Sequence, residues 1–516
     1  MSDAADRGIT VTEIAAMDQP VDVSPEATAA FVGRALRGPL NTPVLVESFG
    51  DFRRRFGDVW SRSSLGPAVR QFFEHGGLRL YVVRVANGAR GAMICLPARG
   101  SALVLRAVDP GSTEFVRAAV DYDGIDDGDA ESFNLTLQRV NPGTGFVMDQ
   151  ELFRRLSHRE KSARFVGDAL LTSTLARVEH PYPSHRPERT VDGGGRIGSM
   201  YVDHVQAGTD GTELSDYDLI GSRAHRTGLF ALERVENFDV LYLPPPGKRL
   251  DTGPAAVLAA EQYCRERRAI LVVDPRAEWT TPSKAARGVR DLGYASPNML
   301  GYFPRMLRRD DDDVARSVGG AIAGLLCKLD RTRGAWDDLD RPGLGLQRNL
   351  VPAFEVQDDD ARVLHRAGLN VIAGGPAGRA RISGSVTMSL GSEAHRMFAK
   401  LPVRRLCLQI VSTIAAAARW AVFEPGNENL ARRVRAQVLT YLCCLNDLGA
   451  FADDRFVVEC DAGVSNRDDA DAHGVAIVLV FRPTGCDDSI SLNLHLTPTG
   501  CRVGSSAFPP PVEDCA

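Results

Sequence analysis

The sequence lacks any segment that resembles a secretion signal or a membrane anchor. Its first fourteen residues, MSDAADRGITVTEI, contain neither a basic region nor an apolar run. The most apolar later stretch, residues 411–423, is short and is interrupted by Arg419. We therefore expect a chain that is neither secreted nor membrane-spanning.

Cysteine contributes no recognisable metal or redox motif. The ten cysteines contain no C-x-x-C pair, and the six that follow residue 440 lack the spacing of metal ligands. The adjacent Cys443 and Cys444 fit packing positions within a helix. This pattern favours reduced thiols in a cytoplasm.

Positive charge is not in excess either. The formal net charge is −5 and the isoelectric point is about 6.1, which gives no basis for binding nucleic acid or an acidic membrane surface. Only 5 of the 61 basic residues are lysine. Arginine suits protein interfaces through planar, bidentate pairing, although genome base composition could produce the same bias.

The motifs of common enzymes are missing as well. The sequence contains no G-x-x-x-x-G-K-[ST], H-E-x-x-H or G-x-S-x-G. The G-x-G-x-x-G at Gly193–Gly198 leads into a strand-like segment, so an inter-domain joint is expected there. The acidic runs at Asp310–Asp313 and Asp358–Asp360 lack the spacing of a Ca²⁺ loop, and Asp210 in GTDG is expected to cap its own turn. We predict no enzyme, no catalytic residue, no cofactor and no metal.

What the chain does have is ample apolar content, 44% of its residues, enough for three or four globular domains. Residues 196–395 alternate strands with helices, including expected helices at 254–267 and 314–329. We divide the chain into an N-terminal arm (1–25), the first part of an α/β domain (26–98), an inserted β domain (99–195), the rest of the α/β domain (196–395), a C-terminal domain with a terminal strand (396–500) and a flexible tail (501–516).

The segment 29–57, AAFVGRALRGPLNTPVLVESFGDFRRRFG, predicts strand, turn, strand and helix in succession. Ser48 followed by Asp51 matches a capping box, and Gly57 suits the residue that ends the helix. This unit carries folding information and no catalytic group.

Both ends of the chain carry alternating, strand-ready segments. Near the N-terminus, Ile9 and Val11 alternate with threonines and are followed by Glu13. Two amphipathic helices, at about 406–421 and 430–445, are followed by three expected strands. The last of these strands alternates apolar residues at Ile490, Leu492, Leu494 and Leu496 with Ser491, Asn493 and His495.

Several of these segments together resemble one family. They are AAFVGRALRGPLNTPVLVESFGDFRRRFG, LGPAVRQFFEHGGLRLYVVRV, GTDG with GLFALERVENFDVLYLPPPG, LPVRRLCLQIVSTIAAAARWAVFEPGNENLARRVRAQVLTYL and FVVECDAGVSNRDDADAHGVAIVLVF. The sequence resembles the contractile tail sheath proteins of myophages, phage-tail-like bacteriocins and related injection systems. The arm GITVTEI keeps the glycine, the alternation and the Glu13 of the family pattern but lacks its proline and aromatic residue.

The resemblance implies an α/β multidomain fold. Its parts are a subtilisin-like α/β sheath domain without protease residues, an inserted β domain on the outside, an α+β C-terminal domain facing an inner tube, and strand-donating arms. The arms are implied to complete sheets in neighbouring subunits through Ile9, Val11, Glu13, Ile490, Leu492, Leu494 and Leu496.

The implied function is structural. The chain would polymerise helically around an inner tube, with hexameric rings, and contract to drive the tube through a target envelope. Its partners would be other copies of itself, the tube protein, and baseplate and tail terminator proteins, with no nucleic acid and no membrane insertion. It would assemble in the bacterial cytoplasm and belong to a virion tail or a released injection particle. The alternatives are a non-contractile scaffold or baseplate component, and a hydrolase on a subtilisin-like fold.

Overall fold

The computed structural model describes residues 27–190, 201–247, 250–308, 315–341, 343–347, 350–375, 378–389, 393–424, 426–461, 474–498 and 500–508. The chain divides into two compact units. The larger one contains Glu26–Leu329 and Leu339–Glu393. The smaller one contains Asp330–Asp338 and the described part of the chain from Ala394 onward.

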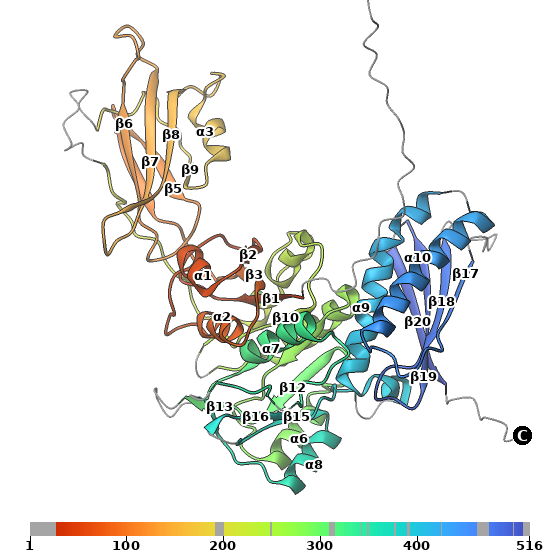
Figure 1. Cartoon of the computed structure of the whole chain (residues 1–516). Helices are drawn as coiled ribbons and strands as arrows, with labels where there is room; N and C mark the ends of the chain where they lie inside the picture. The colour runs from red at the N-terminus through yellow and green to blue at the C-terminus, as the bar shows by residue number, and fades with distance from the viewer. Residues whose placement is uncertain are drawn as a thin grey trace, which may run out of the picture. The chain divides into compact units, whose positions relative to one another are not determined.

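The larger unit is built on an eight-stranded sheet (Figure 1) with the order β16-β15-β12-β11-β10-β1-β3-β2. The six strands from β15 to β3 are parallel, and the two edge strands are antiparallel to their neighbours. Central parallel strands are buried on both faces, which explains the nearly continuous apolar runs predicted as strands. The strands are β1 (Thr28–Gly33), β2 (Val44–Val46), β3 (Arg79–Arg84), β10 (Val240–Tyr242), β11 (Ile270–Val273), β12 (Met299–Phe303), β15 (Leu369–Ala373) and β16 (Arg381–Ser383).

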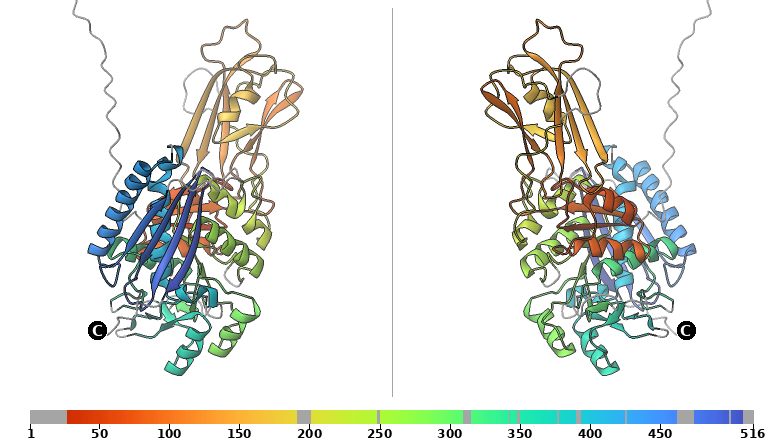
Figure 2. Two further views of the ribbon diagram at one scale, coloured as in Figure 1. Left: turned by 90° about the vertical axis from the view of Figure 1, so that its right-hand side faces the viewer. Right: turned by 90° about the vertical axis from the view of Figure 1, so that its left-hand side faces the viewer.

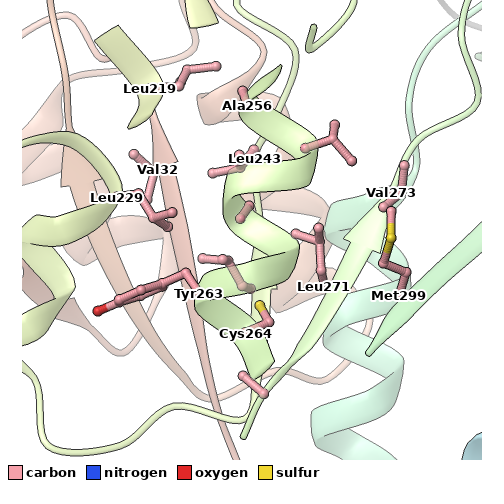
Figure 3. Packing of buried hydrophobic residues seen from close by; sticks show 14 of the residues in the cluster. Val32, Leu219, Leu229, Leu243, Ala256, Tyr263, Cys264, Leu271, Val273 and Met299 are labelled. Atoms are coloured by element: carbon pink, nitrogen blue, oxygen red, sulfur yellow. The ribbon is translucent and has the colours of Figure 1, made fainter. Parts of the chain in front are cut away.

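Helices cover both faces of this sheet. On one face, α4 (Asp216–Ile220), η2 (Gly228–Arg234), α5 (Pro254–Arg267), α6 (Pro282–Asp291) and α8 (Asp358–Arg366) pack on the strands. Figure 3 shows part of this core, where Tyr263 and Cys264 of α5 lie near Leu271 of β11. The predicted helix 254–267 is confirmed by α5.

The other face carries α2 (Leu65–Glu74) and α7 (Gly319–Thr332), which approach each other through glycine. A Cβ on Gly320 would lie 2.3 Å from the carbonyl oxygen of Ala68, so any side chain there would push the helices apart. The helix predicted at 314–329 begins later, at Gly319, because Arg316 exchanges two backbone hydrogen bonds with Met306 instead. Strand β13 (Met306–Arg308) precedes α7 in the chain and β14 (Leu350–Pro352) follows it, and the two pair as a short antiparallel ribbon.

The predicted unit at 29–57 is present. Helix α1 (Phe49–Phe56) begins at Ser48, whose hydroxyl oxygen accepts from the backbone N–H of Asp51 at 3.0 Å, and it ends at Gly57 with φ 87°. The Asp51 carboxylate pairs with Arg54 and Arg55 on the next turn. This unit leads through α2 into β3.

The inserted β region folds around its own core. It contains the sheet β4 (Met93–Ala98), β5 (Ser101–Ala107), β9 (Ala176–Val178) and the sheet β6 (Val116–Asp121), β7 (Ser132–Val140), β8 (Val147–Ser157), with α3 (Val166–Ala169) and η1 (Leu170–Thr172). The two connections to the main sheet pair with each other at Asn87 and Thr212 and at Arg90 and Thr209. The insertion therefore begins about a dozen residues before the expected position 99, because β4 already belongs to it.

The smaller unit is a helix pair on a four-stranded antiparallel sheet. Helices α9 (Leu401–Ala417) and α10 (Glu428–Asp447) are joined by η5 (Arg419–Phe423), and they share one apolar core with the sheet. The left view of Figure 2 faces the sheet, whose order is β17 (Val457–Asp461), β18 (Val475–Phe481), β19 (Ser489–Thr497) and β20 (Gly500–Phe508).

The C-terminal boundary differs from the expectation. Residues 501–516 were expected to form a flexible tail, whereas Gly500–Phe508 form β20. The segment GCRVGSSAF has little β-branched content and no alternation, so the pairing with β19 decides its conformation.

Candidate assembly surfaces

The residues predicted for strand exchange at the C-terminal end lie in the middle of a sheet. Ile490, Leu492, Leu494 and Leu496 are 1–3% exposed and pack in the core of the smaller unit. Their strand, β19, pairs with β18 along seven residues and with β20 along nine. Within this chain β19 is therefore a central strand whose two edges are both occupied.

The residues predicted for strand exchange at the N-terminal end, Ile9, Val11 and Glu13, lie outside the described residues. Their assignment stays a prediction.

The edges of the C-terminal sheet are β17 and β20. In the described part of the chain, no further strand pairs with the outer side of either. An edge strand of this kind can template strand addition. The side chains of β20 hold it weakly, since Val503, which faces the helix layer opposite Leu494, is still 43% exposed.

The sheet face turned away from the helices is polar at its centre. The strand register places one residue of each strand side by side across the sheet, and one such row contains Glu459, Val478, Asn493 and Gly504. Asn493 is exposed and His495 is half-buried, as expected for the polar side of an alternating strand. On the same side of β19, Ser491 and Thr497 are buried, so only part of this face is exposed.

A buried arginine connects the insertion to the main sheet. Arg84, at the end of β3, is 1% exposed, and its guanidinium donates to the carbonyl oxygens of Ala35 (3.1 Å), Gly38 (2.5 Å) and Pro110 (2.7 Å). Burial lowers the pKa of Arg84 to about 10. Sequence reasoning missed this residue, because an arginine at the end of an apolar strand has no pattern that distinguishes it from a surface residue.

Asp210 acts at the same junction. It was expected to cap its own turn, but its carboxylate accepts from the backbone N–H (2.8 Å) and the hydroxyl (2.7 Å) of Ser112. The backbone carbonyls of Asp210 and Gly211 accept from Arg34. The GTDG segment therefore ties the return connection of the insertion to its outward connection and to β1.

An ion-pair cluster stiffens the base of the insertion. The guanidinium of Arg139 lies 2.9 Å from Asp109, 3.1 Å from Glu114 and 3.0 Å from Asp149. Burial raises the pKa of both Asp109 and Glu114, and the nearby Arg139 opposes that rise. One cation shared by three carboxylates fits a structural joint.

The hydrogen bonds of the described histidine rings do not include a nucleophile–histidine pair. The hydrogen bonds of His75, His158 and His365 rings are all made with backbone groups, with no serine hydroxyl on a histidine nitrogen. Within the same residues, no group of three His, Cys, Asp or Glu side chains is placed to hold a metal ion. None of the described helices combines the length and apolar character required to cross a bilayer.

Comparison with known proteins gives a match at the level of structure. No protein-family model matches the sequence, and no curated protein does. The fold is similar to the sheath tail protein of Listeria innocua, with a TM-score of 0.60 and 12% identity over 95% of this chain and 96% of that one. The sheath tail protein of Desulfitobacterium hafniense gives a TM-score of 0.55 and 13% identity over 95% and 100%. The helical sheath of the anti-feeding prophage in its contracted state gives 0.53 and 17% over 94% and 97%.

These similarities confirm the resemblance drawn from the sequence. The chain has the mixed α/β, multidomain fold of contractile tail sheath proteins along nearly its whole length. At 12–17% identity the comparison establishes the fold, and function requires a separate argument.

Proposed function

We propose that this protein is a structural subunit of a contractile sheath. The observation that carries the proposal is the extent of the structural match, which covers 94–95% of this chain and 96–100% of sheath proteins, one of them in a contracted assembly. The α/β body, the inserted β region and the C-terminal unit all fall within that match. A shared single domain would be weaker support, because common folds serve many functions.

We propose that subunits are joined by exchanged strands. Exchange of β19 itself would unpair two neighbours and expose four core side chains, at a cost of about 1.5–3 kcal/mol for each side chain. Detaching the weakly buried edge strand β20 from β19 would cost less free energy, and β20 would regain its hydrogen bonds on the sheet of a neighbouring subunit. The N-terminal arm with Ile9, Val11 and Glu13 is proposed as the second exchanged segment, and β19 as the strand that receives.

Strand exchange of this kind produces an assembly that can grow without closing into a ring. Each subunit gives and receives through different surfaces, so the contacts are heterologous and propagate as a helix around an inner tube. Such a lattice stays connected while rigid bodies shift, and a small free-energy difference per subunit between two packings adds up along it. Contraction on this scheme uses no nucleotide.

The proposal makes this chain a non-enzyme, whose partners are its own copies, a tube protein and the components at the ends of the sheath. The alternative of a baseplate component has one supporting observation, because the anti-feeding prophage baseplate also matches, with a TM-score of 0.52 and 16% identity. The two functions differ in assembly, since a sheath extends indefinitely and a baseplate component forms a closed ring.

Electron microscopy of the purified chain, alone and with its tube protein, tests the proposal. We expect long hollow tubes of uniform width. A chain truncated after Pro498 should keep its folded core and form no tubes, and the core substitution Leu494→Asp should instead unfold the smaller unit. Closed rings that never extend would support the baseplate alternative, and tubes from the truncated chain would contradict exchange of β20.

A further inference from the structure

A cavity lies at the carboxyl ends of the parallel strands in the larger unit. Its lining includes Ser63 and Ser64, which directly precede α2, and Tyr242, the last residue of β10. Ser63 is held there because its hydroxyl and the carbonyl of Arg34, directly after β1, are hydrogen-bonded. The cavity is therefore located between the ends of β1 and β10.

This is the point at which the sheet changes its direction of winding. From β1 the chain passes through α2 to β3 on one side, and it later returns to β10 on the opposite side of β1 and continues through α5. Helix α2 and helix α5 lie on opposite faces of the sheet, as their different core clusters show. Connections that diverge in this way leave a crevice at the carboxyl edge, where open α/β sheets bind ligands.

The cavity is small, and one of its walls is apolar while the other is charged. It encloses about 130 Å³, and since one water needs at least about 10–15 Å³, it has room for a ligand of several non-hydrogen atoms. One wall is apolar, with Val59, Pro67 and Leu250 among its residues. The other wall is strongly cationic.

Among the described residues that line the cavity, four are arginines and one, Glu74, carries a carboxylate. The arginines are Arg70, Arg305, Arg308 and Arg316. Within the described residues, Arg308 forms no ion pair, and its Nε is buried without a hydrogen-bond partner. The guanidinium of Arg70 lies over the Phe49 ring at 4.9 Å. The acidic run Asp310–Asp313 lies outside the described residues and is not counted in this balance.

The floor of the cavity is fixed by buried hydrogen bonds. The hydroxyl of Tyr242 donates to Asp274 at 2.5 Å, and Asp274 also accepts from the first N–H of α7, at Gly319. Arg305 is held by an ion pair with Asp251 and by donation to the carbonyl of Pro275 at 2.7 Å. Asp251 and Asp274 are thus bonded to partners in the floor.

We propose that this cavity binds a small oxyanion, a phosphate or a carboxylate, with a short apolar part against the Val59 wall. Guanidinium groups form bidentate, charge-assisted hydrogen bonds with these groups, and a low-dielectric pocket strengthens them. The site is separate from the sheet edges proposed for assembly. It binds a ligand without a chemical step.

Calorimetric titration of the full, unassembled chain with inorganic phosphate, and separately with citrate, tests the proposal at constant ionic strength set by chloride. We expect saturable binding of at least one anion with a stoichiometry of one. Arg308→Gln should weaken that binding at least about tenfold, since a charge-assisted hydrogen bond contributes about 1.5–3 kcal/mol. Arg70→Gln should act in the same direction, and Arg290→Gln, an exposed arginine on α6, should leave the affinity unchanged.

Each outcome of this titration either supports or contradicts anion binding in the cavity. If Arg308→Gln fails to fold, the comparison of Arg70→Gln with Arg290→Gln decides the matter. If Arg290→Gln weakened the binding equally, the anion would bind diffusely to the surface and the proposal would be overturned. It would also be overturned if binding did not saturate at about 10 mM anion, a concentration typical of weak anion sites. The result does not depend on whether the chain forms tubes, so it is independent of the sheath proposal.

Discussion

Single buried polar residues join segments that are far apart in this chain, and Arg84 is the clearest case. Its guanidinium donates to carbonyl groups on the loop after β1 and on the insertion. Lysine in this position retains the charge but lacks the fork that reaches several acceptors at once. We expect Arg84→Lys to lower the free energy of unfolding by about 2–4 kcal/mol, measured by thermal and denaturant unfolding.

The matched control for that experiment is Arg290→Lys, on the exposed side of α6. It should change stability by less than about 0.5 kcal/mol. A variant Arg84→Lys as stable as the control would show that the carbonyl contacts contribute little.

Glu151 of β8 gives a pH-dependent prediction. It accepts from the Ser173 hydroxyl and from the N–H (2.7 Å) and hydroxyl (2.7 Å) of Thr174. Partial burial raises the pKa of Glu151, but these hydrogen bonds outweigh it and lower the pKa overall. A depressed carboxyl pKa stabilises the fold above the unfolded value near 4.5, and that contribution is lost as pH falls through the folded value.

We therefore expect Glu151→Gln to destabilise the protein at pH 7 by about 0.5–1 kcal/mol, because the group is only partly buried and solvent screens its interactions. The difference from wild type should shrink as pH falls below 4.5. Glu160→Gln, an exposed glutamate on the turn after β8, is the control and should show no such pH-dependent difference. An unchanged difference at pH 3.5 would contradict the assignment.

At the scale of elements, the terminal segments should serve assembly more than folding. The N-terminal arm holds one strand's worth of alternating residues, so its loss should cost the isolated subunit little. Val11→Pro removes a backbone donor that a paired strand requires. We expect a folded subunit with unchanged thermal unfolding that forms no tubes, and Ala4→Pro, outside the alternating segment, to assemble normally.

Electron microscopy and thermal unfolding of the same sample decide this prediction. Normal tubes from Val11→Pro, or a variant that does not fold, would refute strand donation by the arm.

At the scale of the whole molecule, the inserted β region is a separable body. It has its own core, and its two connections meet at Asn87 and Thr212. Excision of residues 88–211 with a short linker should leave the main sheet folded, although with lower stability because the contacts of Arg84 and Arg34 to the insertion are lost. We expect the excised chain to form tubes, seen by electron microscopy after circular dichroism has confirmed folding. A folded but non-assembling product would place lattice contacts on the insertion.

Elements whose signals are local could be predicted from the sequence. Turn residues and the Ser48 cap placed α1, apolar runs placed the parallel strands, and helical periodicity placed α5 and the C-terminal helix pair. Combined segments also pointed to the sheath fold. Such features depend on neighbours in the chain, so the sequence alone carries them.

Which strand lies at the edge of a sheet, and which polar residue is buried, depends on the packing of the whole chain. An alternating pattern shows that β19 has one buried face, but it contains nothing about how many partners pair with its edges. Likewise Arg84 and Asp210 acquire their hydrogen-bond partners from segments 26 to 176 residues away. Hydrogen-bond partners and edge positions are properties of chain packing, and packing brings together residues whose sequence neighbourhoods carry no trace of each other.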